Sequence, residues 1–236
     1  MEALKLTGIV KRFGDVTVLN GLSVEIPLAG LTFIVGKSGS GKSVLCRLAV
    51  GLLKPDEGRV ELLGQRVDTL PERQLVPLRA RVPYLVQGPA LLDWLTLEAN
   101  VALAAKGLPD DGRVARALER MGLTGLKGRS PPQVGPGIRK RTAIARALVL
   151  EPTCLLLDEP TTGLDSIAAG QVNEALEAVR AAGLGAMVVS HDYAALSRLA
   201  DRVVEVRQGV VGYHGDKAGL LARTQDDGRS APPAEP

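Results

Sequence analysis

One eight-residue stretch, "GKSGSGKS" at Gly36–Ser43, constrains this chain more than any other part of its sequence. It follows the nearly continuous apolar run "LTFIV" and leads into "KSVLCRLAVGLL", whose apolar residues have helical spacing. The stretch fits the pattern G-x-x-x-x-G-K-[ST], in which glycines let several backbone N–H groups point at one anion. The sequence therefore predicts a buried strand, a phosphate-binding loop and a helix in direct succession.

Every residue of this loop has a predicted place beside a nucleotide phosphate. Lys42 is expected to reach the β- and γ-phosphates, and the Ser43 hydroxyl is expected to bind Mg²⁺. The positive end of the following helix adds to the attraction for an anion. The alternative, a flexible Gly/Ser turn, is disfavoured by the strand and helix on either side. The predicted phosphate-binding residues are Gly36, Lys37, Ser38, Gly39, Ser40, Gly41, Lys42 and Ser43.

A second apolar run, "CLLLDEP", ends in two neighbouring acids. Asp158 is expected to orient Mg²⁺ through its water shell. Glu159 comes next, where a carboxylate can polarise an attacking water. The alternative is a surface turn that happens to be acidic. Two acids after a buried strand, in a chain with a phosphate loop, favour the catalytic interpretation.

Two more polar residues follow apolar runs. His191 ends "VVSHD", at the carboxyl end of a predicted strand, where parallel sheets bind ligands. Gln87 closes "VPYLVQ" and is expected to sense Mg²⁺ or water and to pass movement to the segment that follows. His214, in "VVGYHG", has no such setting and is expected to be a surface residue.

Composition narrows the remaining possibilities. Only 3% of the residues are aromatic, so stacking platforms for single-stranded nucleic acid are not expected, although the net charge is +3. The two cysteines, Cys46 and Cys154, fall in predicted core elements and suit a reducing cytosol. No apolar run is long enough to cross a membrane, and the N-terminus lacks a secretory apolar region. If the protein acts at a membrane, another chain is expected to span it.

The remaining sequence is organised around these motifs. The N-terminal part alternates apolar and polar residues, as antiparallel strands do, in "ALKLTGIVKRF", "TVLNGLSVEIP" and "RVELLGQRV". Residues 88–150 are rich in Leu, Ala and Arg with helical spacing, which predicts a helical insertion. The runs "CLLLDEP" and "GAMVVSHD" flank a predicted helix, so a right-handed crossover and a parallel sheet are expected. The polar, Pro-rich end of the chain is expected to be disordered.

Taken in order, these motifs resemble the ATP-binding subunit of ATP-binding cassette (ABC) transporters. The resemblance extends from Leu4 to about Gly215. It implies an α/β fold with a RecA-like P-loop NTPase core, a mainly parallel sheet, an N-terminal antiparallel β subdomain and an inserted helical subdomain. The expected boundaries are 1–222 for the ATPase domain, with 1–87 and 151–222 as core and β subdomain, 88–150 as helical subdomain and 223–236 as disordered tail.

The resemblance also implies roles for individual residues. The family hydrolyses ATP with Mg²⁺, and its predicted metal residues here are Ser43, Gln87 and Asp158. The "GKSGSGKS" loop resembles the Walker A motif. Phe13 matches the aromatic residue that stacks on adenine, and Gln87 matches the Q-loop glutamine. Asp158 matches the Walker B aspartate, and Glu159 matches the catalytic glutamate. Asp165 of "TTGLD" matches the D-loop aspartate at the dimer seam, and His191 matches the switch histidine at the γ-phosphate.

The family also implies partners. Its subunits act as head-to-tail dimers, homo- or heterodimeric, on the cytoplasmic face of the membrane, where they drive transmembrane permease subunits. The strings "GPALLDWLTLEANVAL" and "IRKRTAIARAL" look most like the ATPase of Mla-type systems, which move phospholipid and are associated with organic-solvent resistance. Leu92, Trp94, Leu95 and Leu97 are expected to lie at the groove that receives the permease, or else to be ordinary core residues.

One motif departs from the family. The signature L-S-G-G-Q precedes R-x-R-x-A-x-A-R-A-L, so alignment on "RKRTAIARAL" puts Val134–Ile138 on those five positions. Gly137 matches the second glycine. Gly135 replaces a serine whose hydroxyl would bond the partner's γ-phosphate, and Pro136 has no N–H to donate. Proline is tolerated in the first turn of a helix, so a helix is still expected here.

Two other functions share much of this pattern. A soluble cassette ATPase that drives iron–sulfur assembly or DNA maintenance would have the same nucleotide site, although DNA-maintenance relatives usually carry long coiled-coil insertions that this chain lacks. A non-hydrolytic binding module is the other alternative, and the presence of Glu159 and His191 argues against it. Transport is therefore the leading prediction, and no nucleic-acid partner is expected.

Overall fold

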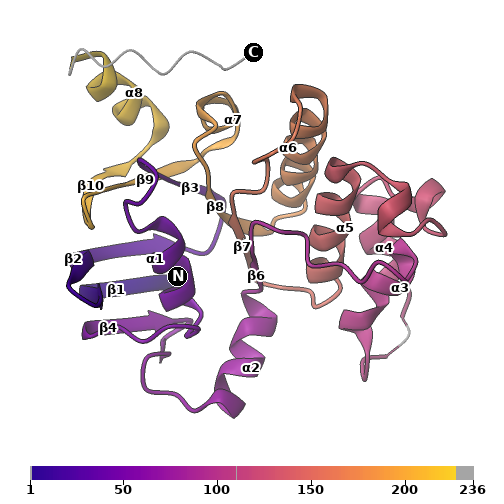
Figure 1. Ribbon diagram of the computed structural model, residues 1–236, viewed down its shortest axis with the longest axis horizontal. Helices are drawn as coiled ribbons and strands as arrows, with labels where there is room; N and C mark the ends of the chain where they lie inside the picture. The colour runs from indigo at the N-terminus through magenta and orange to yellow at the C-terminus, as the bar shows by residue number, and fades with distance from the viewer. Residues whose placement is uncertain (1, 110, 227–236) are drawn as a thin grey trace.

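The computed structural model describes residues 2–109 and 111–226, arranged as two sheets and a group of helices (Figure 1). The strands are β1 (Ala3–Phe13), β2 (Val16–Pro27), β3 (Leu31–Val35), β4 (Glu57–Leu62), β5 (Gln65–Arg66), β6 (Tyr84–Leu85), β7 (Cys154–Asp158), β8 (Gly185–Val189), β9 (Arg202–Arg207) and β10 (Val210–Gly215). The helices are α1 (Lys42–Ala49), α2 (Glu72–Arg81), α3 (Leu97–Ala102), α4 (Arg113–Arg120), α5 (Pro136–Leu148), α6 (Ser166–Ala181), α7 (Tyr193–Leu199) and α8 (Lys217–Asp226).

The larger sheet has the strand order β10-β9-β3-β8-β7-β6. Strand β3 pairs in parallel with both β8 and β9, and β7 pairs in parallel with β8 and β6, while β10 runs antiparallel to β9. Every residue of β3, β7 and β8 is buried, as expected of parallel strands covered on both faces. The carboxyl ends of β3, β6, β7 and β8 therefore meet at one edge, and each is followed by a predicted site residue.

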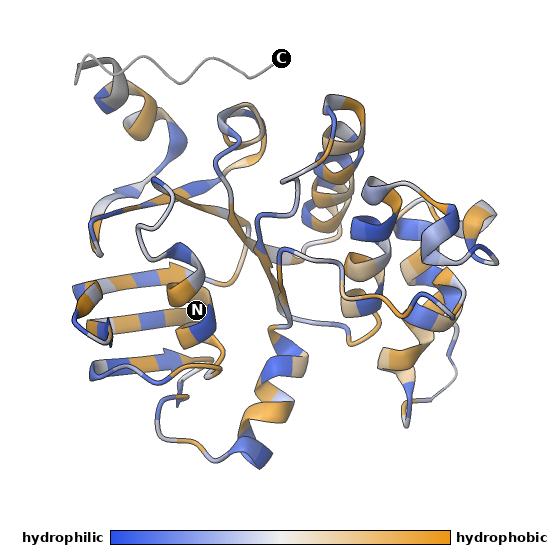
Figure 2. Ribbon diagram, viewed as in Figure 1, coloured by the Kyte–Doolittle hydropathy of each residue, from blue (hydrophilic) through white to orange (hydrophobic). Residues whose placement is uncertain are grey.

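The smaller sheet is antiparallel, with the order β2-β1-β4-β5. Its strands alternate between apolar and polar residues, whereas the central strands of the larger sheet are apolar along their length (Figure 2). Helix α1 contributes Leu45, Cys46 and Leu48 to the apolar core that this sheet shares with Ile34 and Leu156 of the larger sheet. Burial of the helix between the two sheets fixes the direction of its N-terminus, where the phosphate loop ends.

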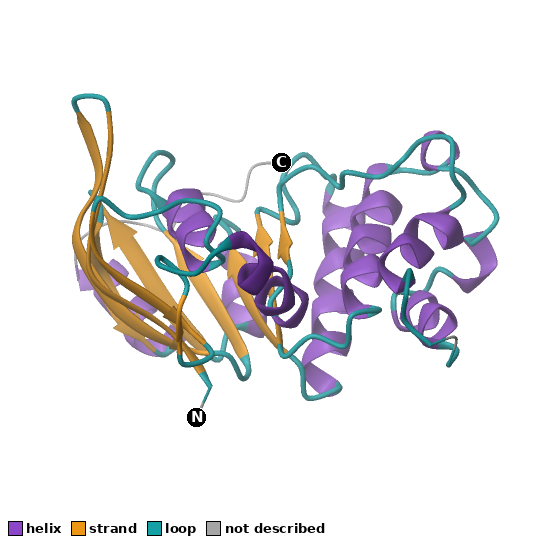
Figure 3. Cartoon of the chain, turned by 90° about the horizontal axis from the view of Figure 1, so that it is seen from below, coloured by secondary structure: helices purple, strands orange, loops and turns teal. Residues whose placement is uncertain are grey.

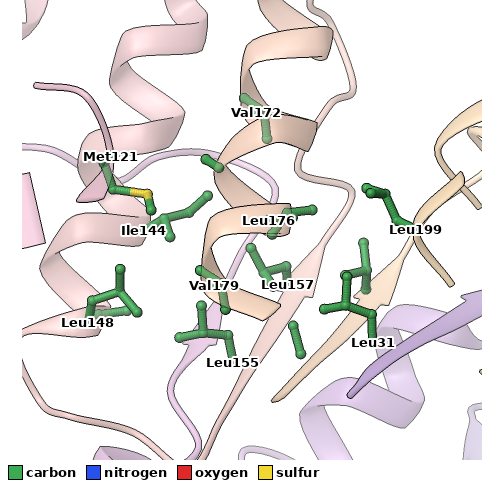
Figure 4. Close-up of a cluster of buried hydrophobic side chains, with 14 of the residues drawn as sticks. Leu31, Met121, Ile144, Leu148, Leu155, Leu157, Val172, Leu176, Val179 and Leu199 are labelled. Atoms are coloured by element: carbon green, nitrogen blue, oxygen red, sulfur yellow. The ribbon is translucent and has the colours of Figure 1, made fainter. Parts of the chain in front are cut away.

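The helices α3, α4 and α5 gather at one end of the molecule, away from the antiparallel sheet (Figure 3). Their apolar faces join α6 and the larger sheet in a second core, in which Ile144 and Leu148 of α5 lie near Leu155 of β7 and Val179 of α6 (Figure 4). Helix α5 thus belongs both to the helical group and to the packing of the nucleotide-site sheet.

The fold class predicted from the sequence is confirmed, although individual elements differ, and no prediction was made for β9, β10, α7 or α8. The predicted strand "VPYLVQ" is reduced to the two residues of β6. The run "RVELLGQRV" forms two strands, β4 and β5, because Gly64, with φ of 76°, turns the chain between them. Helix α2 was not predicted, since Pro77 in its interior and its polar composition obscure the helical pattern.

The C-terminal boundary also differs. Helix α8 continues to Asp226, past the predicted start of a disordered tail at residue 223, and the rest of that tail lies outside the described residues. Within residues 2–109 and 111–226, no helix is both long and apolar enough to span a membrane.

Candidate functional site

The loop between β3 and α1 has the backbone geometry of an anion-binding cradle. Gly36 and Gly41 have φ angles of 148° and 104°, which residues with side chains rarely adopt. A Cβ on Gly36 would lie 2.2 Å from the carbonyl oxygen of Val206, and one on Gly41 would lie 2.6 Å from Cδ2 of Leu19. Both positions therefore require glycine. Gly41 caps α1 without a side-chain hydrogen bond, which leaves the first-turn N–H groups to an anion.

The polar side chains of the loop also fit a phosphate. Lys42 is buried, and its ammonium donates to the carbonyl oxygens of Gly36 at 2.8 Å and Lys37 at 2.9 Å. The Ser40 hydroxyl is buried and has no hydrogen-bond partner among the described residues. A buried cation and an unpaired hydroxyl beside a ring of N–H groups are donors that phosphate oxygens satisfy.

Asp158, the last residue of β7, meets the start of α1. Its Oδ1 accepts a hydrogen bond from Ser43 Oγ at 3.1 Å, and its Oδ2 accepts one from Tyr84 Oη at 2.7 Å. Hydroxyl and carboxylate oxygens suit Mg²⁺, which keeps most of its waters and shares phosphate oxygens. Among the described residues no group of three or more His, Cys, Asp or Glu side chains could hold a metal alone. The Ser43 hydroxyl and the Asp158 carboxylate are oxygen ligands that fit Mg²⁺ bound together with nucleotide phosphates.

Glu159 and His191 lie together, although they are far apart in sequence. His191 Nδ1 is 2.8 Å from Glu159 Oε2, and the Thr162 hydroxyl donates to the same oxygen at 2.9 Å. Glu159 has φ of 51°, a conformation that is uncommon outside glycine, and its N–H donates to the carbonyl of Val189 on β8. Two side chains and a fixed backbone thus orient one carboxylate oxygen, Oε2.

Gly135–Gly137, in the segment aligned with the family signature, form the N-terminus of α5. Gly135 is the N-cap, with φ of −68° and open space around its Cβ position, and Pro136 is the first helical residue, as predicted. A Cβ on Gly137 would lie 2.9 Å from the Cβ of Ala168 in α6. Close packing of two helices therefore explains why glycine is needed at 137 but not at 135.

Two further predicted residues lie at the surface. Phe13 ends β1, is 46% exposed, and has the Lys11 ammonium 5.5 Å from its ring centre. Asp165 is the N-cap of α6, where its side chain accepts from the Ala168 N–H at 2.8 Å. The fold thus gives Asp165 a helix-capping role that does not depend on its predicted position at a dimer seam.

Comparison with known proteins identifies the family. Residues 19–162 match the family described as ABC transporter. The chain belongs to the ABC transporter family. The methionine import ATP-binding protein MetN of Mesorhizobium japonicum is 34% identical over 232 residues, which cover 96% of this chain and 64% of that protein. The chain therefore spans slightly less than two thirds of this relative.

Solved structures of the family have the same fold. The cbiO1 protein of Clostridium perfringens, part of the ABC transporter complex cbiONQ, matches with a TM-score of 0.87 at 28% identity, over 96% of this chain and 93% of that chain. A dimeric ATP-binding cassette in a post-hydrolysis state, bound to ADP and Pi, matches with a TM-score of 0.79 at 27% identity, over 90% and 98% of the two chains. The phosphate loop described above belongs to an ATP-binding domain of this family.

In this ABC protein, the side chain of Gln87 is exposed and is not among the hydrogen-bond partners of Asp158. Its carbonyl instead accepts a hydrogen bond from Lys140 of α5. Arg146, further along α5, donates to the carbonyls of Ala90 at 2.8 Å and Pro89 at 3.3 Å. Two cations of α5 therefore hold the Q-loop, which comprises residues 87–90.

A cavity of about 380 Å³ opens between this Q-loop and the helices. It is lined by Tyr84, Leu85, Val86, Leu103, Ala143 and Arg146, among others. None of Leu92, Trp94, Leu95 and Leu97 is part of that lining, and Leu97 is fully buried, so its core interpretation is correct. The apolar wall of this cavity comes from β6, α5 and Leu103, and a permease groove at this place stays a prediction.

Trp94 remains the most exposed large apolar residue of the described chain, at 78%. The loop that carries it is held by buried Asn100, whose side chain accepts from the Leu92 N–H and donates to the carbonyls of Leu92, Leu95 and Thr96. An exposed indole on a loop held in this way has the properties of a contact residue for another protein.

Proposed function

We propose that this chain is the ATP-hydrolysing subunit of a membrane transporter. The observation that carries the proposal is the Glu159–His191–Thr162 group, which lies at the same sheet edge as the Ser43–Asp158 pair and the phosphate loop. A nucleotide-binding module without hydrolysis would not need an oriented carboxylate at that edge. Membership of the ABC family and its transporter relatives supports the proposal over an assembly or repair ATPase.

The chain's own residues account for the chemistry. The loop N–H groups and Lys42 bind the phosphates, and Phe13 stacks on the adenine. Glu159 takes a proton from the attacking water through Oε1, while His191 holds its other oxygen and faces the γ-phosphate. Ser43 and Asp158 would hold Mg²⁺, which neutralises charge on the β- and γ-phosphates. Gln87 is proposed to sense Mg²⁺ or water and to pass movement to the helical segment that follows it.

We propose that the active form is a dimer. The family relative solved as a dimer with ADP and Pi supports this arrangement. In a head-to-tail pair, the N-terminus of α5, with Gly135 and Gly137, faces the partner's ATP, and Asp165 lies at the seam. Either a second copy or a related ATPase subunit fits this role.

The altered signature then has a functional consequence. Without a serine at 135 and an N–H at 136, this chain offers its partner's γ-phosphate one or two fewer hydrogen bonds. Each hydrogen bond to a charged group is worth roughly 1.5–3 kcal/mol. A homodimer would turn over slowly at both sites, and a heterodimer would be asymmetric.

The membrane partner is proposed from the surface beside the nucleotide site. The Q-loop cavity and exposed Trp94 are apolar features suited to a short helix of a permease subunit on the cytoplasmic face. The choice of transported substrate is expected to be determined by that permease partner. The comparisons do not support phospholipid, because the named relative MetN is a methionine import ATP-binding protein, so the Mla-type resemblance remains a hypothesis.

Phosphate release by the purified chain, with Mg²⁺ and ATP, tests the hydrolytic proposal. Co-purification after mild detergent extraction tests the transport proposal, and a polytopic membrane protein is the expected companion. Release of phosphate without any membrane companion would favour a soluble assembly ATPase. No release from a folded, ATP-binding dimer would point to a binding module.

A further inference from the structure

The Walker B aspartate has a hydrogen-bond partner that the motifs do not include. Both oxygens of Asp158 are occupied, Oδ1 by Ser43 and Oδ2 by Tyr84. The Tyr84 contact, at 2.7 Å, is the shorter of the two. Asp158 is only 6% exposed, so water cannot easily replace a lost donor. The orientation of this carboxylate therefore depends on a residue from another strand.

The position of Tyr84 follows from the sheet. Strand β6 is a two-residue strand that pairs in parallel with β7, and Tyr84 lies opposite Leu156, two residues before Asp158. The ring packs against the core shared by α1 and both sheets. A phenylalanine would fill the same space, so only the hydroxyl distinguishes this residue from an apolar core residue.

The hydroxyl is fixed as a donor. An ionised carboxylate can only accept a hydrogen bond, so the Tyr84 hydroxyl donates to Asp158 Oδ2. Tyr84 also lines the Q-loop cavity, so one side chain contacts both the predicted metal ligand and the surface proposed for the permease.

We propose that Tyr84 is a positioning residue for the magnesium–nucleotide site: its hydroxyl holds Oδ2 of Asp158 so that Oδ1 stays beside Ser43, where the metal and its waters bind. This rests on the proposed ATP-binding function. Hydrogen-bond partners of metal-site residues change metal affinity or activity by about 10–100-fold when they are removed. The hydroxyl of Tyr84 is expected to act in this range.

The test is the Mg²⁺ dependence of binding of a fluorescent, non-hydrolysable ATP analogue to the full chain carrying Tyr84→Phe. Tyr213→Phe is the matched control, because it removes a hydroxyl that donates to the carbonyl of Asp216 at the surface. Tyr84→Phe is expected to raise the Mg²⁺ concentration for half-maximal binding about tenfold and to leave metal-free binding unchanged. Tyr213→Phe is expected to change neither quantity.

A Mg²⁺ requirement within twofold of the parent, in a folded Tyr84→Phe protein, would overturn the proposal. So would an equal loss of binding with and without Mg²⁺, which indicates a merely structural role. If the parent itself binds no ATP analogue, the proposed function fails instead. Should Tyr84→Phe not fold, 3-fluorotyrosine can be incorporated into a chain that also carries Tyr193→Phe and Tyr213→Phe. The more acidic phenol at 84 must then shift the Mg²⁺ requirement, and an unchanged requirement overturns the proposal.

Discussion

The N-termini of α1 and α5 are alike in their capping residue but differ in backbone conformation and packing. Each helix begins after a glycine N-cap that has no side-chain hydrogen bond, at Gly41 and at Gly135. At Gly41 the backbone is left-handed and the Cβ position is occupied by Leu19, whereas at Gly135 the backbone is extended and the Cβ position is open. Glycine is therefore obligatory in the first cap and replaceable in the second.

This difference shows which of the two helix N-termini has its sequence constrained by the packing of the chain itself. The cap of α1 is held between two sheets and is proposed to bind this chain's own nucleotide. The cap of α5 is proposed to face a partner's nucleotide, and of its residues Gly135–Gly137 only Gly137, packed on Ala168, has an obstructed Cβ position. Sequence can vary at 135 and 136 without disturbing the fold, so turnover at the partner's site can change independently of ATP binding.

The largest expected effect comes from the chain's own site. Glu159→Gln keeps the size of the side chain but removes the proton acceptor. Turnover is expected to fall about a hundred- to ten-thousandfold, in the range of general-base catalysis, while ATP binding is retained. Phosphate release and binding of labelled ATP measure the two effects. Near-parental turnover would show that Glu159 is not the base.

The same substitution at the two caps tests their difference directly. Gly41→Ser places a side chain in a left-handed conformation against Leu19 and is expected to cost about 1–3 kcal/mol of unfolding free energy and to abolish ATP binding. Gly135→Ser supplies a preferred N-cap residue in open space and is expected to stabilise by a few tenths of a kcal/mol. Denaturant unfolding and ATP binding check both variants. Equal effects at the two positions would remove the distinction.

A smaller effect is expected at the contact between α5 and α6. Gly137→Ala gains about 1 kcal/mol of helix propensity but overpacks Ala168, which costs about 1–3 kcal/mol, so a net loss of up to about 2 kcal/mol is expected. The control is Gly170→Ala on α6, where nothing lies near the Cβ position and stabilisation is expected. Thermal unfolding distinguishes them. If Gly137→Ala is as stabilising as Gly170→Ala, packing does not explain the retained glycine.

The sequence predicts the parts of the site that are encoded locally. The phosphate loop, Asp158 and Glu159 each follow a buried strand, and parallel strands bring such ends together, so their meeting with His191 could be anticipated. The loop's spacing also specifies the backbone at Gly36 and Gly41.

Other contacts could not be predicted because they join distant segments through single side chains. Tyr84 looks like a core residue in "VPYLVQ", and only the register of β6 on β7 brings its hydroxyl to Asp158. The bond from Thr162 to Glu159 depends on the local turn after β7. The hydrogen bond from Lys140 to the Gln87 carbonyl depends on how α5 packs beside the Q-loop.

Phosphate release from the purified dimer, before and after the paired change Gly135→Ser and Pro136→Gly, tests whether a complete nucleotide site is combined with a weakened signature. Restoring a hydroxyl and an N–H to the partner's γ-phosphate is expected to raise turnover roughly tenfold or more, from a low starting value, with little change in ATP affinity. Unaltered turnover in a protein that still dimerises with ATP would contradict the account.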